Sequence, residues 1–182
     1  MKNGFYLGGL GVARSALAVN RRIERQKVNS TILIALGNPL MSDEGVGVRV
    51  LSAVRDLAPE GVEFLDSGNS GMRILHALSD RRRAVFVDCA YMDEPPGTLR
   101  VFTPGEVASR KVLPRLSLHE GDLLQTLEMA ERLGILPSET ILLGIQPDSV
   151  GPGLELSSVL VGKFDSYVKT ALSALRDGIE QP

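Results

Sequence analysis

The chain has 182 residues, of which 43% are hydrophobic and 23% are charged, and its formal net charge is -2. This length and composition are typical of one soluble globular domain that needs no disulfide or structural metal to hold its core. The near-neutral charge argues against nucleic acid or an anionic membrane as partner, so we expect a protein or small-molecule substrate. Cys89 is the single cysteine of the sequence, which excludes a disulfide framework.

Residues 1–30 carry a lysine, an apolar stretch and a later arginine pair, as an export signal would. Arg14 interrupts the stretch, however, and Arg21-Arg22 precede further charged residues instead of an apolar core. We interpret residues 1–30 as a flexible arm or an over-extended start, followed by one domain over residues 31–178. We therefore expect a cytoplasmic protein, and no apolar run in the sequence approaches the roughly 18 residues of a membrane span.

Apolar periodicity alternates between strand and helix along the rest of the chain. It predicts strands over 32–36, 62–66, 84–90 and 140–145, and an edge strand over 98–102. It predicts helices from about 43 to 57, and over 71–78, 119–133 and 157–175. This alternation predicts a single-domain α/β fold, a three-layer sandwich with a mostly parallel twisted sheet flanked by helices.

Small and polar residues follow or end the first three predicted strands. They are Gly37-Asn38, Asp66-Ser67-Gly68 and Asp88-Cys89. The carboxyl ends of parallel strands meet at one edge of a sheet, and α/β proteins have their active crevice there. Glu44 lies in the loop after the first strand, and His119 opens a predicted helix that can reach the same edge. Two carboxylates and an imidazole are thus expected around one spot.

A site that groups Glu44 and Asp88 favours a cation or the protonation of one acid. Two carboxylates about 5 Å apart repel by roughly 3 kcal/mol at an effective dielectric constant of about 20. Two oxygen ligands and one nitrogen suit nickel or zinc better than calcium. The alternative is structural for each residue: Asp43 and Glu44 favour a helix N-terminus, Asp88 caps a turn, and His119 lies on a solvated helix face. Spacing alone leaves both interpretations open.

Five segments, taken in chain order, resemble the hydrogenase maturation endopeptidases, the family that trims the large subunit of nickel-iron hydrogenases. ALGNPLMSDEGVGVRVL is similar to the family pattern Gly-x-Gly-Asn-x-Leu-x-x-Asp-[Asp/Glu]-Gly-x-Gly. DSGNSGMRIL resembles its Asp-Gly-Gly-x-x-Gly segment, and FVDCA resembles its acid at the end of the third strand. LSLHE resembles its histidine loop, and LLGIQPDSVGPGLELSSVL its late Gly-x-Gln-Pro segment. The resemblance covers about residues 31–175.

The resemblance implies an endopeptidase that removes a C-terminal extension from a hydrogenase large-subunit precursor after nickel insertion. It implies that Glu44, Asp88 and His119 are the catalytic and metal-binding residues. The nickel is expected to be carried by the substrate, and other divalent ions to substitute for it. A bound metal would polarise the scissile carbonyl and a water, or an unprotonated acid would act as general base, as in an aspartic-type endopeptidase. We expect a monomer, because the sequence shows no long exposed apolar stripe.

Substrate-binding residues are expected along the same edge of the sheet. They are Asn38, Asp66, Gly68, Gly71 and Gln146. Gly68 and Gly71 are predicted to line the substrate groove, where positive φ or close backbone approach needs glycine, with simple turn residues as the alternative. Ala35 and Ser67 depart from the family pattern, but neither replaces a predicted ligand, and Ala35 is expected inside the strand.

Four other functions are compatible with parts of the sequence. Peptidyl-tRNA hydrolases share Leu-Gly-Asn-Pro after a first strand, but Ser42-Asp43-Glu44 follow here and a basic footprint for RNA is missing from the composition. A nucleotide-binding module would need the motif G-x-G-x-x-G, which this sequence lacks. A cysteine protease would need Cys89 as nucleophile, whereas a lone buried cysteine is more often a packing residue. A non-cleaving nickel-sensing or chaperone module would keep the same three ligands. His76 is given a structural role.

Overall fold

The computed structural model describes the backbone of residues 31–109 and 118–176, and the side chains of these residues except 108–122. The predicted arm over residues 1–30 lies outside the described residues. Within them, the strands are β1 (Thr31–Leu36), β2 (Val62–Gly68), β3 (Arg83–Cys89), β4 (Leu99–Phe102) and β5 (Glu139–Ile145). The helices are η1 (Ser42–Gly45, a 3-10 turn), α2 (Val46–Arg55), α3 (Gly71–Leu78), α4 (Pro104–Ser109), α5 (Leu118–Arg132) and α6 (Ser158–Leu175).

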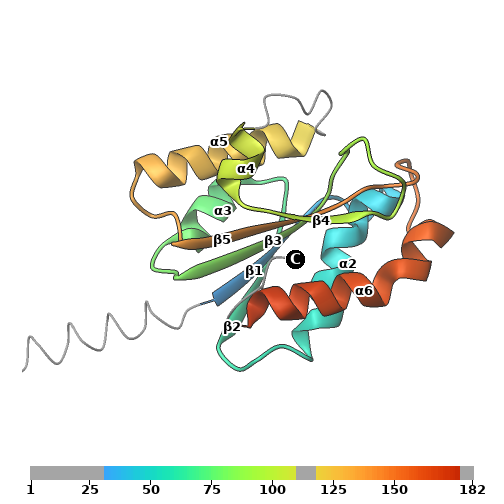
Figure 1. Cartoon of the computed structure of the whole chain (residues 1–182), viewed down its shortest axis with the longest axis horizontal. Helices are drawn as coiled ribbons and strands as arrows, with labels where there is room; N and C mark the ends of the chain where they lie inside the picture. The colour runs from blue at the N-terminus through green and yellow to red at the C-terminus, as the bar shows by residue number, and fades with distance from the viewer. Residues whose placement is uncertain (1–30, 110–117, 177–182) are drawn as a thin grey trace, which may run out of the picture.

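The five strands form one sheet in the order β2-β1-β3-β5-β4 (Figure 1). All neighbours are parallel except β4, which pairs antiparallel with β5 at the edge. The α/β fold class and the edge position of the strand over 98–102 are therefore confirmed. Because four strands run the same way, their carboxyl ends meet at one edge of the sheet.

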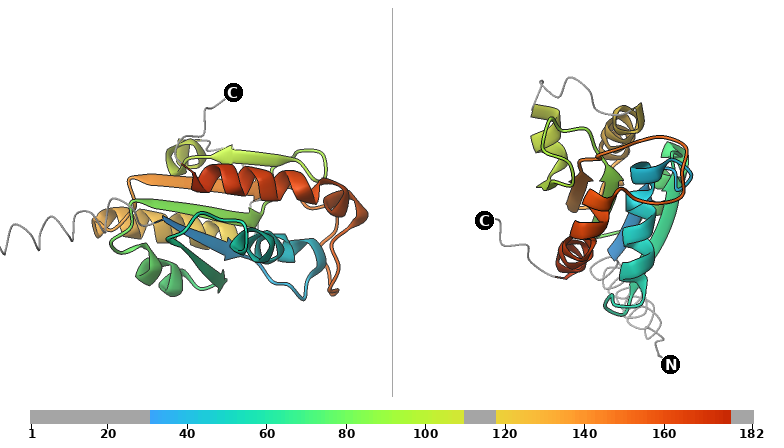
Figure 2. Two further views of the ribbon diagram at one scale, coloured as in Figure 1. Left: turned by 90° about the horizontal axis from the view of Figure 1, so that it is seen from below. Right: turned by 90° about the vertical axis from the view of Figure 1, so that its right-hand side faces the viewer.

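Helices cover both faces of the sheet and make the three layers seen in Figures 1 and 2. On one face, α2 and α6 pack on a cluster that includes Val85 and Val87 of β3. On the other face, α3, α4 and α5 pack on a cluster that includes Ala84 and Phe86. Side chains alternate along a strand, so Asp88 shares the face of Phe86, toward α5. In the described part of the chain, no helix is long and apolar enough to cross a membrane.

The short helix α4 is the one described helix that the apolar pattern did not predict. Its start has a capping box: Glu106 accepts a hydrogen bond from the backbone N–H of Thr103 at 2.7 Å, and the Thr103 hydroxyl accepts one from the Glu106 N–H at 3.4 Å. Pro104 occupies the first helical position, where its missing N–H costs nothing. The sequence Thr-Pro-Gly-Glu therefore carried a local signal for α4, although its six residues are too few for a clear apolar period.

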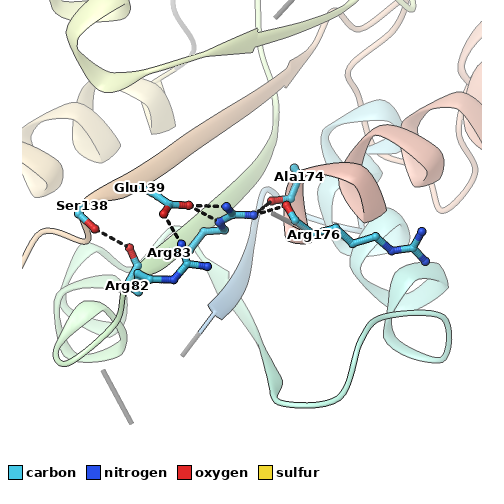
Figure 3. Close-up of polar contacts among 6 residues, drawn as sticks. All are labelled: Arg82, Arg83, Ser138, Glu139, Ala174 and Arg176. Atoms are coloured by element: carbon cyan, nitrogen blue, oxygen red, sulfur yellow. Dashed lines mark hydrogen bonds and ion pairs between the residues drawn. The ribbon is translucent and has the colours of Figure 1, made fainter. Parts of the chain in front are cut away.

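Arg82 and Arg83 lie where the parallel strand β3 begins, at the end of the sheet away from the carboxyl ends of the strands (Figure 3). Arg83 fixes the end of α6. Arg83 at the start of β3 is 4% exposed, and its Nε donates to Glu139 of β5 at 2.6 Å. Its Nη1 donates to the carbonyl of Ala174 at 3.1 Å and to that of Arg176. Arg82 pairs with the other oxygen of Glu139. One buried guanidinium thus neutralises a carboxylate and satisfies carbonyls at the negative end of α6.

We predict that Arg83→Ala lowers the free energy of unfolding by about 3 kcal/mol, because one oxygen of the Glu139 carboxylate and two helix-end carbonyls lose the buried guanidinium as donor. Arg82→Ala removes a partner of the same carboxylate from a more exposed position, and its cost should be about 1 kcal/mol or less. Urea unfolding of both variants measures the difference. Equal losses would contradict the special role of Arg83.

Candidate functional site

Asp88, at the carboxyl end of β3, carries a buried carboxyl group whose bonding is incomplete. The residue is 6% exposed, and its Oδ1 accepts a hydrogen bond from the backbone N–H of Cys89 at 2.8 Å. Its Oδ2 is buried and has no hydrogen-bond partner among the described residues. The pKa of Asp88 is raised to about 7, mainly by burial and in addition by the charge of Glu44, against the lowering effect of the Cys89 hydrogen bond. A cation beside this carboxyl would remove the cost of its negative charge.

Glu44 reaches this edge because two glycines let η1 and α2 approach the strand ends closely. Gly37 has φ +106°, and a Cβ there would lie 2.0 Å from the carbonyl oxygen of Glu44. A Cβ at Gly47 would lie 2.5 Å from the carbonyl oxygen of Val87 and 2.6 Å from that of Leu36. Such distances are far below van der Waals contact, so only glycine fits at either position. The glycine spacing of the motif therefore brings the Glu44 segment against the ends of β1 and β3.

Asp43, the neighbour of Glu44, is fully buried and has a different task. Its Oδ2 accepts backbone N–H bonds from Asp148 at 3.0 Å and Ser149 at 2.9 Å. Its Oδ1 accepts the N–H of Ser157 at 2.7 Å, just before α6 begins. Three charge-assisted bonds to one carboxylate tie the loop after β5 to η1. The expectation that Asp43 favours a helix N-terminus was incomplete. Its carboxylate oxygens bind backbone N–H groups of a segment more than 100 positions away in the sequence.

Backbone contacts extend the link that Asp43 makes between the two loops. Met41 forms a parallel bridge with Gly153. The Ser42 N–H donates to the carbonyl of Gly153 at 2.9 Å, and the Ser42 hydroxyl donates to that of Gly151 at 3.0 Å. Residues 38–45 and 147–157 therefore form one cross-linked rim beside Asp88.

The structure gives the predicted groove glycines different surroundings. Gly68 has φ +53° and open space where a Cβ would be. A Cβ at Gly71 would lie 2.5 Å from Oγ1 of Thr126, so this glycine lets α3 pack closely on α5. Ser67 donates to the carbonyl of Ala35 at 2.9 Å, where the pairing of β1 and β2 is irregular. Ala35 lies within β1, as expected. Lining of a substrate groove stays a prediction for both glycines.

Three further residues with a predicted substrate role use side-chain oxygens within the protein. Asn38 accepts the N–H of Leu40 at 3.0 Å, and Asp66 accepts that of Gly68 at 3.0 Å. Gln146 is 7% exposed, and its Oε1 accepts the N–H of Met92 at 2.7 Å. These bonds shape the turns after β1, β2 and β3, and contact of the three residues with substrate stays a prediction.

The predicted three-residue ligand set falls partly outside the described side chains. His119 belongs to the first turn of α5, as expected, but its side chain is not described. Among the side chains that are described, no three His, Cys, Asp or Glu residues form a group able to hold a metal. His76 is exposed on α3, so its structural role stays a prediction, whereas Cys89 is buried in the core cluster beneath α2 and α6, as expected of a packing residue.

Tyr91, just after β3, is a residue near these acids that the sequence interpretation missed. It follows Asp88 by three positions and is 39% exposed. Its pKa is raised by burial and by the negative charges of Cys89, Glu44 and Asp43. The phenol thus lies within electrostatic reach of the acids. Its position just after a strand end was the available signal.

The fold and this edge define an α/β protein with two acids, Glu44 of η1 and Asp88 of β3, at the carboxyl ends of its parallel strands. A family model described as hydrogenase maturation protease matches residues 48–174. The hydrogenase 2 maturation protease of Escherichia coli (strain K12) is 29% identical over 153 residues, which covers 82% of this chain and 93% of that protein. The hydrogenase expression/formation protein HupD of Bradyrhizobium diazoefficiens is 30% identical over 166 residues and covers 82% of this chain and 86% of its own.

Solved structures agree with these sequence relatives. The hydrogenase maturating endopeptidase HybD from E. coli superposes with a TM-score of 0.74 at 27% identity and covers 81% of this chain and 93% of its own. The hydrogenase 2 maturation peptidase from Thaumarchaeota archaeon SCGC_AB-539-E09 has a TM-score of 0.59 at 32% identity, with 80% and 97% covered. The chain belongs to the hydrogenase maturation protease family, and its activity is hydrolysis of a peptide bond.

We predict that Asp43→Asn lowers the free energy of unfolding by about 2–4 kcal/mol, because an amide keeps one acceptor and turns an N–H₂ group toward backbone donors. Asp148→Asn makes the same chemical change on the exposed surface of the clamped loop and should stay within about 0.5 kcal/mol of wild type. Urea unfolding measures both variants. Hydrogen exchange should show faster exchange of the amides of Ser149 and Ser157 in Asp43→Asn alone, and unchanged protection there would contradict the clamp.

Proposed function

We propose that this protease removes the C-terminal extension of a hydrogenase large-subunit precursor after nickel insertion, and that it recognises the nickel held by that precursor. Family membership supports a hydrogenase precursor as substrate. The observation that carries the nickel proposal is the carboxyl of Asp88, which is buried, incompletely bonded and under the influence of a second acid, Glu44.

A divalent ion resolves the electrostatic conflict between these two acids. With no cation, burial and the charge of Glu44 favour the protonated form of Asp88 near neutral pH. An ion arriving with the precursor would bind the deprotonated carboxylate and release that proton. The negative charge of Asp88 is unfavourable in the free protein and is neutralised by the ion in the complex. The site therefore favours substrate that carries its metal over substrate that lacks it.

His119 is the third proposed ligand. It belongs to the first turn of α5, and α5 packs on the same sheet face that carries the side chain of Asp88. Borderline divalent ions accept an imidazole nitrogen together with carboxylate oxygens, so a set of Glu44, Asp88 and His119 suits nickel. An ion bound by three protein groups keeps positions for the ligands that the precursor supplies.

In this proposal, the residues of the protease place the scissile bond rather than carry a permanent metal. The ion of the precursor rests at the strand ends, and the peptide that follows it lies along the rim of residues 38–45 and 147–157. Water adds across the peptide bond, giving a new carboxylate and a free amine. An unprotonated carboxylate at the strand ends is suited to accept the proton of the attacking water as general base. A monomer in the cytoplasm remains our prediction for its working form.

We predict that Glu44→Gln and His119→Ala each lower the cleavage rate of nickel-loaded precursor at least about 100-fold while the protein stays folded. The assay mixes purified protease with nickel-loaded or nickel-free precursor and follows the shorter product on a gel and by mass spectrometry. His76→Ala is the matched control and should cleave like wild type. Circular dichroism verifies that each variant is folded.

The outcomes separate the parts of the proposal. Wild-type cleavage rates in Glu44→Gln or His119→Ala would refute the ligand assignment. Equal cleavage of nickel-loaded and nickel-free precursor would refute recognition of the metal. Binding of loaded precursor without any shortening would refute the proposed processing and favour a non-cleaving module.

A further inference from the structure

An apolar cavity lies beside Asp88, between the sheet and the helices α4 and α5. Its volume is about 50 Å³. Strands β3, β4 and β5 form its floor, and helices α4 and α5 close it from above. It is lined by Phe86, Asp88, Ala90, Met92, Phe102, Val107, Leu123, Leu124, Leu142, Leu143 and Gly144. Among the described lining residues, Asp88 alone has a charged side chain, and the others are apolar.

The cavity is partly open to the surface of the described structure. Asp88 and Ala90 are 6% exposed and Met92 is 7% exposed, whereas Phe86 and Leu143 on the cavity floor are 1% exposed. The residual exposure is shared by lining residues from β3, the segment after it, and α5, where Leu123 is 6% exposed. The cavity is therefore a pocket that a small group can enter.

The pocket offers two kinds of contact at once. Its walls favour an aliphatic group, since water gains few hydrogen bonds there. Asp88 borders the pocket, and its buried Oδ2 has no hydrogen-bond partner within the described residues and can accept an ion. A precursor that carries its ion supplies both groups, because the ion is the partner of Oδ2 and a neighbouring residue of the extended peptide brings an apolar side chain.

We propose that this pocket receives an aliphatic side chain of the precursor next to the scissile bond, and so selects the sequence at the cut. The inference rests on the proposed function, in which Asp88 holds the ion of the precursor. Because the same residue borders the pocket and the ion site, a peptide anchored at the ion presents its neighbouring side chains to the pocket mouth. The ion then restricts cleavage to nickel-loaded precursor, and the pocket determines which peptide bond is cut.

The volume sets which side chain fits. An apolar cavity of about 150 Å³ accommodates benzene, and one water needs about 15 Å³. A pocket of about 50 Å³ therefore suits a short side chain such as alanine or valine and excludes an aromatic ring. Gly144 contributes to this size, because a Cβ there would lie 3.1 Å from both Ala90 Cβ and Met92 Sδ.

The test changes the size of the pocket and of the precursor residue together. Val107→Phe fills the pocket from α4, and Leu124→Ala enlarges it from α5. Val161→Phe makes the matched change on the exposed surface of α6, on the other face of the sheet. Each enzyme is given nickel-loaded precursors in which the residues on either side of the cut are replaced singly by glycine, valine or phenylalanine.

At one of the two positions, we expect wild type and Val161→Phe to prefer valine, with kcat/KM for phenylalanine lower by roughly 10- to 200-fold. Val107→Phe should lose the preference for valine over glycine, and Leu124→Ala should gain cleavage of the phenylalanine precursor. A gain of activity in Leu124→Ala requires a folded enzyme, so it tests the pocket even if Val107→Phe is unstable. Unchanged preferences in both pocket variants would overturn the inference, whereas failure of wild type to cleave any precursor would overturn the proposed function instead.

Discussion

The structure depends on one unusual constraint, a carboxyl group held almost entirely out of water at the end of a central strand. Burying such a group without a complete set of partners costs free energy, and the cost appears as the raised pKa of Asp88. A second acid, Glu44, adds to that cost instead of relieving it. Nothing in the packing of β3 requires an acid here, because the neighbouring positions on the same face are apolar. Such an arrangement is expected where an ion arrives with the substrate.

The two adjacent acids of the first loop divide the work of building this edge. Asp43 is completely buried and uses both oxygens to bind backbone N–H groups of the distant loop after β5. Glu44 is only half-buried, and its negative charge raises the pKa of Asp88. Glycines at positions 37 and 47 allow the segment to lie directly on the strand ends. The rigidity of the rim therefore comes from Asp43, and its charge toward the proposed ion comes from Glu44.

Local patterns predicted most of the architecture, because the buried strands and amphipathic helices each carry their own period. Helix α4 was not predicted, because its apolar pattern is too short to show a period. Its capping box was the stronger local signal. The role of Asp43 could not be predicted, because its partners lie more than 100 positions along the chain. The same holds for the packing of Gly71 on Thr126 and for the pocket, whose walls come from five separate elements. Sequence spacing identified Asp43, Glu44 and Asp88 as acids at this edge of the sheet. It did not show that Asp43 has a structural role.

The most direct test of the central claim is a crystal structure of the full chain with nickel or another divalent ion bound. We predict one ion at the carboxyl ends of β1 and β3, with an oxygen of Glu44, Oδ2 of Asp88 and a ring nitrogen of His119 each about 2 Å away. An ion bound elsewhere, with Oδ2 of Asp88 still lacking a partner, would contradict it.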